Sequence, residues 1–490
     1  MLSLANSQGY ARNSSKYCIR QACAVFAEPL GRRSLTQEDD LYQLYAELHR
    51  PQFHFTAKEN WLNDPNGLVY VDGVWHLFFQ HNPHATVWGN MTWGHAVSHD
   101  LMHWRQLEHA LYPDEMGTMF SGSAVVDHHN SAGFGSGALL AFYTAAGSGA
   151  SPARPFTQCL AYSLDAGENW VKYAANPVVD WIEDDNRDPK VIWHAPSRRW
   201  VMALYITADR YALLVSEDAR HWRTTQEIVL TGDTECPDFF PLHDAAGVER
   251  WVFWGASGRY LIGSFDGATF TVETEQQWCE QGANGYAAQT WSNAPDGRLV
   301  QVSWMAGGLY PEMPFNQQMS IPVELKLLGA GSSVRLARQP VAELATLYRR
   351  SVSAARVALN PGQPYVVDTQ ARLFDCNLTL SKDTAKALYI VVRGQTLTLD
   401  WHRGLLKFAG GRPHKLNSTV ADIALPRADK LVLRLLVDLT CCEIFINDGA
   451  LSASFCYLPD AYEHPLVLHS SGAVQSLDHL QLHELNSSWQ

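Results

Sequence analysis

Three acidic residues of this 490-residue chain stand in tight, turn-rich sequence contexts. Asp64 lies within Trp-Leu-Asn-Asp-Pro-Asn-Gly at 61–67, Asp188 within Asn-Arg-Asp-Pro-Lys at 186–190, and Glu235 within Thr-Glu-Cys-Pro-Asp-Phe-Phe at 234–240. Cleavage of a glycosidic bond with retention of configuration needs two carboxyl groups about 5–5.5 Å apart, one nucleophilic and one acidic. If the fold brings these loops together, they could supply that chemistry.

The first two contexts also have plainer interpretations. Asp-Pro and Asn-Gly around Asp64 are turn-forming pairs, so this segment could be a simple turn before a strand. Arg187 next to Asp188 can hold the Asp188 carboxyl in its ionised form, but an ordinary surface ion pair would have the same sequence. Neither motif alone predicts a catalytic site.

The third context suggests an acid catalyst. Cys236, a proline and an aromatic pair follow Glu235 and indicate an apolar wall beside its carboxyl. Such a wall favours the protonated form that an acid catalyst needs near neutral pH. An ordinary loop glutamate is the plainer interpretation, and Asp238 is a nearby competitor for the role.

The composition limits the kinds of partner. The formal net charge is -13, from 37 basic and 50 acidic residues, which argues against binding to the phosphates of nucleic acid. A neutral substrate fits this balance best. No apolar stretch approaches the about 18 residues that a membrane-spanning helix needs. The 17 Trp, 19 Tyr and 19 Phe suit both strand packing and stacking on sugar faces.

The nine cysteines are irregularly spaced, and two of them, Cys441 and Cys442, are adjacent. This pattern favours free thiols in a reducing compartment over a disulfide framework. Residues 1–36 are basic but lack the apolar core of a secretory signal, so of the two locations left open, cytoplasmic and extracellular, the cytoplasmic one is favoured. No cluster has metal-ligand spacing, and the chemistry above requires no metal or other cofactor.

From about residue 50 to 325, short apolar runs alternate with Gly, Asn, Asp and Pro turns, which is typical of strands. A Ser-x-Asp turn followed by an aromatic residue recurs in this region, with starts at 98, 163, 216 and 264. Strand-rich repeats with the spacing of these four starts indicate propeller blades, and four copies therefore predict four or five blades.

The repeat pattern ends near residue 328. A Gly/Ser-rich stretch and a short predicted helix form a linker at 329–352, after which strands resume. We therefore predict an all-β chain with a poorly structured lead-in at 1–48, a propeller at 49–328 and an antiparallel β-sandwich at 353–490.

Taken together and in order, these motifs resemble glycoside hydrolase family 32, which includes invertases, inulinases and levanases. The resemblance extends from about residue 50 to 490. It depends on the acidic motifs at 61–67, 187–189 and 235–237, on Phe-Ser-Gly-Ser at 120–123, and on the segment from Val437 to Gly449. The family usually has Met where this chain has Leu62, an apolar exchange of similar volume. The resemblance implies a five-bladed β-propeller followed by a β-sandwich.

The resemblance also implies roles for individual residues. Asp64 would attack the anomeric carbon of a fructosyl unit, and Glu235 would act as general acid and then as general base. Asp188 would bind the fructose hydroxyls and favour the oxocarbenium-like transition state. The family's sugar-binding positions correspond to Asn63, Gln80, Trp88, Phe120, Ser121, Arg187, Tyr286 and Trp304. For Trp88, Tyr286 and Trp304, packing inside a blade is the alternative.

The implied activity is release of terminal β-fructofuranosyl units from sucrose or from the fructans inulin and levan. Segments 286–290 and 314–318 look more like fructan exo-hydrolases than strict sucrose enzymes. Three alternatives remain open: an inverting propeller glycosidase that cleaves arabinan or xylan, a fructosyltransferase with the same site, and a non-catalytic carbohydrate-binding propeller. The expected partner is a small or polymeric fructoside, with no nucleic acid or membrane; the oligomeric state is open.

Overall fold

A computed structural model describes residues 44–381, 385–409 and 422–489. The predicted lead-in at 1–48 lies almost entirely outside these residues. The described chain consists of strands β1 to β34 and four short 3-10 helices, so the prediction of an all-β fold is confirmed. In the described part of the chain, no helix is long and apolar enough to cross a bilayer. The seven cysteines described are free thiols.

The first part of the chain forms five sheets of four or five strands, in order along the sequence except for one strand. The first sheet contains β1 (Asn60–Val71), β2 (Val74–Asn82), β3 (Thr92–Ser98), β4 (Arg105–Gln106) and β20 (Phe315–Asn316). The second contains β5 (Thr118–Asp127), β6 (Ala138–Ala146), β7 (Thr157–Ser163) and β8 (Val171–Lys172). The third contains β9 (Arg187–His194), β10 (Arg199–Thr207), β11 (Arg210–Ser216) and β12 (Arg223–Val229).

The fourth sheet contains β13 (Asp238–His243), β14 (Glu249–Trp254), β15 (Arg259–Phe265), β16 (Phe270–Val272) and β17 (Gln277–Trp278). The fifth contains β18 (Gly285–Thr290), β19 (Val300–Met305), β21 (Val323–Leu328) and β22 (Arg335–Pro340). The 3-10 helices η1 (Gly147–Gly149), η2 (Pro295–Gly297) and η3 (Gly331–Ser333) lie in connections of these sheets.

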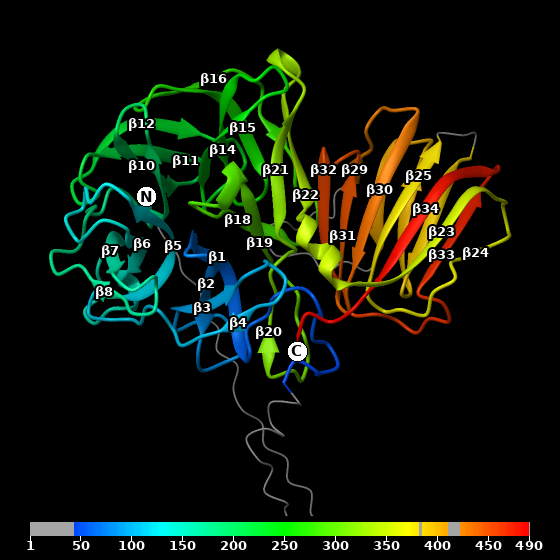
Figure 1. Cartoon of the computed structure of the whole chain (residues 1–490), viewed down its shortest axis with the longest axis horizontal. Helices are drawn as coiled ribbons and strands as arrows, with labels where there is room; N and C mark the ends of the chain where they lie inside the picture. Colours follow the sequence, from blue (N-terminus) through cyan, green and yellow to red (C-terminus); the bar gives the residue numbers. More distant parts are fainter. Residues whose placement is uncertain (1–43, 382–384, 410–421, 490) are drawn as a thin grey trace, which may run out of the picture. The chain divides into compact units, whose positions relative to one another are not determined.

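The first strands of the five sheets contact one another in a closed ring. β1 contacts β5, β5 contacts β9, β9 contacts β13, β13 contacts β18, and β18 contacts β1 again. Figure 1 shows these sheets arranged around a common centre, from blue through green. Strands such as β6 are buried at every position because both faces of a sheet are covered by its neighbours. The starts of five strands therefore meet in one place.

The recurring Ser-x-Asp turns lie at the end of the third strand in four of these sheets. After β3, the Trp104 indole donates to the Leu101 carbonyl, and Trp170 and Trp222 make the matching bond after β7 and β11. At the fourth turn, after β15, Asp266 accepts two main-chain N–H bonds. In the fifth sheet a Gly/Ser-rich turn follows β21 instead, which explains why five sheets carry only four copies of the repeat.

The rest of the described chain forms two antiparallel six-stranded sheets. One contains β23 (Tyr348–Leu359), β25 (Phe374–Ser381), β30 (Lys430–Val437), β31 (Cys441–Ile446), β32 (Leu451–Cys456) and β34 (Gln475–Leu485). The other contains β24 (Tyr365–Val366), β26 (Ala387–Val392), β27 (Gln395–Asp400), β28 (Leu405–Ala409), β29 (Ile423–Ala424) and β33 (Leu466–Ser471). Buried and partly exposed residues alternate along β27 and β33, as expected where one face packs inward and the other meets solvent.

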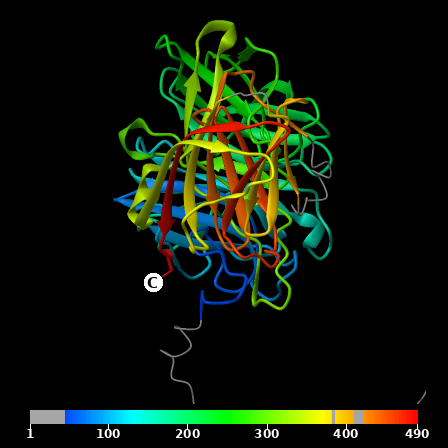
Figure 2. The same ribbon diagram turned by 90° about the vertical axis from the view of Figure 1, so that its right-hand side faces the viewer.

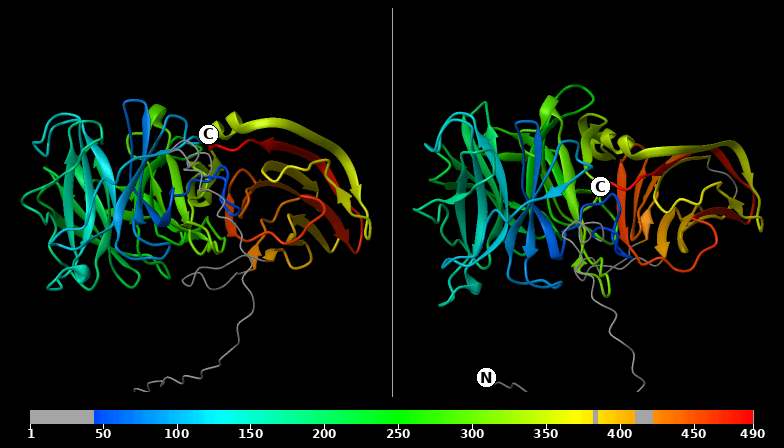
Figure 3. Two further views of the ribbon diagram at one scale, coloured as in Figure 1. Left: turned by 90° about the horizontal axis from the view of Figure 1, so that it is seen from below. Right: turned by 60° about the horizontal axis from the view of Figure 1, so that its bottom comes forward.

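Figure 2 faces these two sheets, drawn in yellow to red, and Figure 3 shows them from below as two curved layers. The predicted linker at 329–352 proves more structured than expected. It contains β22, which pairs with β21, then the 3-10 helix η4 (Ala342–Leu347), and then the start of β23. The short helix predicted there is thus a 3-10 helix that connects the fifth sheet to the six-stranded sheets.

Candidate active site

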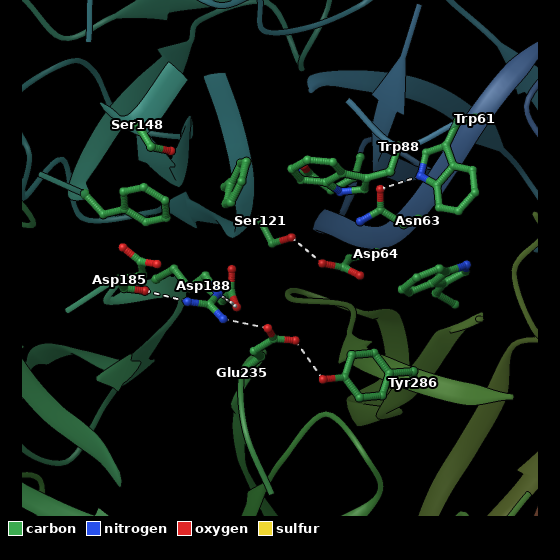
Figure 4. A pocket seen from close by; sticks show the side chains of 15 residues that line it. Trp61, Asn63, Asp64, Trp88, Ser121, Ser148, Asp185, Asp188, Glu235 and Tyr286 are labelled. Atoms are coloured by element: carbon green, nitrogen blue, oxygen red, sulfur yellow. Dashed lines mark hydrogen bonds and ion pairs between the residues drawn. The ribbon is translucent and has the colours of Figure 1, made fainter. Parts of the chain in front are cut away.

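A cavity of about 570 Å³ lies where the first strands of the five sheets meet. Figure 4 shows its lining side chains, which come from the starts of β1, β5, β9 and β18, from the ends of β2 and β19, and from connecting segments. All eleven residues selected from the sequence line it: Asn63, Asp64, Gln80, Trp88, Phe120, Ser121, Arg187, Asp188, Glu235, Tyr286 and Trp304. Four further lining residues were not selected: Trp61, Ser148, Phe156 and Asp185.

Asp64 lies at an irregularity of β1. The register between β1 and β2 shifts between Leu62 and Pro65, because proline cannot donate to the ladder, and such a bulge re-aims the side chains within it. The Ser121 hydroxyl donates to Oδ2 of Asp64 at 2.6 Å. Burial raises the pKa of Asp64 above its usual value; the Ser121 bond lowers it, and the neighbouring Glu235 charge raises it further. The Cys236 thiol also donates to Oδ2 of Asp64, at 3.6 Å. A carboxylate held in this way and open to the cavity is suited to nucleophilic attack.

Asp188 has a left-handed backbone, with φ of 64°, immediately before Pro189. This conformation costs a non-glycine residue about 1–3 kcal/mol and persists only where surrounding contacts impose it. Its main-chain N–H donates to the Thr144 hydroxyl at 2.9 Å, and its Oδ2 accepts from the Cys236 N–H at 3.1 Å. Burial raises the pKa of Asp188 to about 7; Arg187 opposes this change, and the charges of Glu235 and Asp64 add to it.

Glu235 is held by two polar partners. Arg187 Nη2 donates to Oε1 at 2.5 Å, and the Tyr286 hydroxyl donates to Oε2 at 2.7 Å (Figure 4). Glu235 and Cys236 both have positive φ, 58° and 37°, which turns the carboxyl into the cavity. The two donors, Arg187 and Tyr286, were not indicated by the residues that follow Glu235 in the sequence. The thiol of Cys236 contacts the other two acidic residues, at 3.4 Å from Asp188 Oδ2 and 3.6 Å from Asp64 Oδ2.

Asp238, the competitor for the acid role, does not line the cavity. It is fully buried, pairs with Lys190 at 3.2 Å, and accepts the Thr290 N–H at 2.6 Å. A carboxylate so completely paired has no access to a substrate. We call Asp64, Asp188 and Glu235 the carboxylate trio.

Aromatic rings form much of the cavity wall. Trp61 and Trp304 meet edge to face at 6.2 Å, and the Trp61 indole donates to Asn63 Oδ1 at 2.9 Å. The Trp304 indole donates to Oε1 of Gln317 at 3.0 Å, so the segment 314–318, noted in the sequence, holds this wall in place. Trp88 is 57% exposed and lines the cavity, so it is not packed inside a blade.

A second group of acidic residues lies outside the cavity. His54 Nδ1 is 2.9 Å from Asp438 Oδ2, and His54 Nε2 is 2.8 Å from Glu443 Oε1. Among the described residues, one group of three side chains could hold a metal ion: the imidazole of His54, the carboxylate of Asp438 and the thiol of Cys441. Asp438 Oδ2 also accepts the Phe53 N–H at 2.9 Å, so hydrogen bonds account for this geometry. We call His54, Asp438, Cys441 and Glu443 the junction cluster.

Burial works against protonation of His54, but Cys441 and the hydrogen bonds to Asp438 and Glu443 together raise its pKa well above 6.5. Burial also acts against ionisation of Asp438, but its bond with His54 lowers the Asp438 pKa below 3.8. The junction cluster therefore holds a buried imidazole between Asp438 and Glu443, an arrangement that favours its protonated form. It ties the segment before β1 to β31 and its preceding turn.

Known proteins identify the class to which this chain and its cavity belong. The family model for the N-terminal domain of glycosyl hydrolases family 32 matches residues 54–340, which span all five sheets. The chain belongs to glycoside hydrolase family 32, whose members are enzymes with a β-propeller and a β-sandwich. The resemblance stated from the motifs is thus confirmed.

Individual relatives are similar over most of the chain. A levanase from Bacillus subtilis is 35% identical over 91% of this chain and 72% of its own length. An extracellular exo-inulinase from Aspergillus niger is 30% identical over 91% of this chain and 96% of its own length. The structure of a fructofuranosidase from Schwanniomyces occidentalis complexed with fructose superposes with a TM-score of 0.80, at 25% identity, over 90% of this chain and 99% of that one.

Proposed function

We propose that this protein is a retaining β-fructofuranosidase that releases terminal fructose from fructans or sucrose. The observation that supports this proposal most strongly is the convergence of Asp64, Asp188 and Glu235 on one cavity. Of the three, only Glu235 is held by both a guanidinium and a phenol. Similarity to proteins named levanase and exo-inulinase favours fructans as substrates. Such substrates are neutral, in keeping with the charge of the chain.

The five small sheets are, in this proposal, the blades of one propeller, closed by the contact of β18 with β1. The two six-stranded sheets form the sandwich. Because β22 pairs with β21, we place the end of the propeller at Pro340, where the family model also ends, and restrict the linker to η4. The cavity then lies at the axis of the propeller, where loops of all blades can contribute groups.

The first chemical step forms a covalent intermediate. The Asp64 carboxylate attacks the anomeric carbon of the fructosyl unit while the bond to the leaving oxygen breaks. Glu235 transfers its proton to that oxygen, so the leaving sugar departs neutral. Asp188 accepts hydrogen bonds from fructose hydroxyls and stabilises the positive charge that develops on the ring.

The second step reverses these proton movements. The Glu235 carboxylate removes a proton from water, the water oxygen attacks the anomeric carbon, and the bond to Asp64 breaks. Two inversions give net retention. Arg187 and Tyr286 hold the Glu235 carboxyl in one place through both steps.

Release of free sugar from sucrose, inulin and levan tests this function directly, with an Asp64→Ala variant alongside. Wild-type protein should release fructose, and Asp64→Ala should abolish the release. Absence of fructose from all three substrates would refute the catalytic proposal, and binding of the sugars without turnover would then favour a carbohydrate-binding role. Excess glucose over fructose from sucrose, with new oligosaccharides, would instead indicate fructosyl transfer.

A further inference from the structure

Three consecutive acidic residues precede β9, and they have different surroundings. Glu183 pairs with Arg210 at 2.6 Å, and Asp184 accepts from the Thr207 hydroxyl at 2.6 Å. The Asp185 carboxylate, in contrast, has no hydrogen bond or ion pair with any residue in the described ranges, and it lines the cavity. The Asp185 main-chain carbonyl accepts from Arg187 Nη1 at 2.7 Å, so its backbone is held while its side chain is not.

Two further residues lie with Asp185 in the lining of the cavity. Ser148 is exposed in η1, and its hydroxyl has no hydrogen-bond partner within the part of the chain that the structure describes. Phe156 is buried and meets Phe120 edge to face at 5.5 Å. In Figure 4, Ser148 and Asp185 lie on the side of the cavity opposite Trp61 and Asn63. We call Ser148, Phe156 and Asp185 the rim group.

The exposed fraction of each carboxyl side chain indicates how deep it lies in the cavity, from the floor to the rim. The Asp188 side chain is 7% exposed, the Glu235 side chain is 26% exposed, and Asp185 belongs to the exposed class. A fructosyl unit that reaches Asp64 and Asp188 therefore occupies the floor, and the oxygen that Glu235 protonates faces outward. The leaving group must extend from there toward the rim.

We propose that the rim group is the subsite for the leaving sugar, with Asp185 as its principal hydroxyl acceptor; this inference rests on the proposed function. A carboxylate without a partner can accept bonds from two vicinal hydroxyls of a sugar, whereas the indoles of the opposite wall can only donate or stack. The Phe156 ring offers an apolar face, and the Ser148 hydroxyl completes the set. The ligand class is a neutral polyhydroxylated leaving group, such as a hexose or a second fructosyl unit.

The test compares two leaving groups in the same enzyme. One substrate is a fructose disaccharide, sucrose or inulobiose, whichever the wild type cleaves faster; the other is methyl β-D-fructofuranoside, whose leaving group carries no sugar hydroxyls. For Asp185→Ala, kcat/KM on the disaccharide should fall about 10–100-fold, the usual effect of losing a hydrogen bond that involves a charged group. For the same variant, kcat/KM on the methyl substrate should change by less than about twofold, because a group that touches only the leaving sugar makes no contact with a methyl leaving group.

Two controls separate this effect from a general change of charge or fold. Asp184→Asn removes a neighbouring charge away from the cavity and should leave both substrates unaffected, while Ser148→Ala should give a smaller loss confined to the disaccharide. Equal losses on both substrates in Asp185→Ala, or no loss on the disaccharide, would overturn the proposal. If wild-type protein cleaves neither substrate, the proposed function itself fails, which is a distinct result.

Discussion

The carboxylate trio and the junction cluster are both groups of carboxylates largely removed from water, but the chain treats them in opposite ways. The junction cluster places His54 between Asp438 and Glu443 and has no residue with positive φ among these three. The trio has left-handed backbone at Asp188 and Glu235, and burial together with the Glu235 charge raises the pKa of both Asp64 and Asp188. The junction cluster is fully paired and sealed from solvent, whereas the carboxylate trio keeps unsatisfied hydrogen-bonding capacity that faces the cavity.

This difference separates groups that stabilise the fold from groups that do chemistry. A buried charge costs free energy unless partners compensate for it, so uncompensated carboxyls persist only where function requires them. Asp238 and Glu235 show the same contrast within one short segment: Asp238 is sealed against Lys190, and Glu235 faces the cavity. Replacing members of the two groups should therefore have opposite consequences.

The largest expected effect is that of Asp188→Asn on catalysis. Turnover should fall about 10³-fold, because the variant loses a charge aimed at the transition state. The pKa of Asp188 is about 7 in the folded protein and near 4 in the unfolded chain. Ionisation of this carboxyl therefore favours the unfolded chain, and the folded state loses stability as pH rises from about 4 to about 7. Above pH 7 the variant should thus be more stable than wild type, as measured by urea unfolding. If Asp188→Asn instead lowers the free energy of unfolding above pH 7, then Asp188 stabilises the fold, as the junction cluster does.

Asp438→Asn should have the reverse outcome. Removing one partner of a buried ion pair leaves the His54 charge uncompensated and should cost about 3–5 kcal/mol in the free energy of unfolding. The folded protein should retain its fructose-releasing activity within about twofold. Asp72→Asn, at an exposed turn, is the matched control and should change neither quantity. Loss of activity without loss of stability would contradict the structural role.

Ser121→Ala should weaken the nucleophile without removing it. The lost 2.6 Å bond stabilises the Asp64 carboxylate, so the Asp64 pKa should rise and the acidic limb of kcat/KM should move to higher pH. At a pH on that limb the rate should fall about tenfold. Ser123→Ala, which alters a hydroxyl on the same strand that bonds the Pro189 carbonyl, should leave the limb in place.

The smallest expected effect concerns the pH dependence of Tm. Because the His54 pKa is raised in the folded state, its stabilising contribution is full below the unfolded value near 6.5 and is lost as pH rises through the folded value. The difference in Tm between wild type and His54→Gln should therefore narrow above pH 6.5. A chelator should leave Tm and activity unchanged, whereas a drop on chelation would indicate a metal in the junction cluster.

Much of this protein was predictable from local sequence. The short aromatic runs specify strands, because strand propensity depends on the dihedral preferences of a few neighbouring residues. The Ser-x-Asp turns were visible for the same reason, since each is closed by side chains within eight residues of its start. The turn expected around Asp64 is wrong: the Asp-Pro and Asn-Gly pairs lie within β1, where pairing with β2 absorbs them as a register shift, and Asp188 lies within β9. The three acidic residues selected from their local contexts, Asp64, Asp188 and Glu235, lie at one cavity, as do the eight sugar-binding positions that the family resemblance implied.

Other features depend on contacts between distant segments. No local signal showed that β20 would add to the first sheet next to β1, or that Asp185 would be left unpaired while Glu183 and Asp184 found partners. The partners of Glu235 come from Arg187 and Tyr286, 48 and 51 positions away. The residues next to Glu235 in the sequence therefore did not indicate these polar partners.

The sequence by itself determined the all-β class, the Ser-x-Asp turns and the identity of the acidic residues, because short-range backbone and capping preferences encode them. Only the tertiary structure decided which carboxyl is sealed, which is open, and which is held by a guanidinium. The physical reason is that desolvation and charge pairing depend on the groups that surround a side chain in space. Those groups are supplied here by five separate sheets and by segments almost four hundred residues apart, as in the contact of His54 with Glu443.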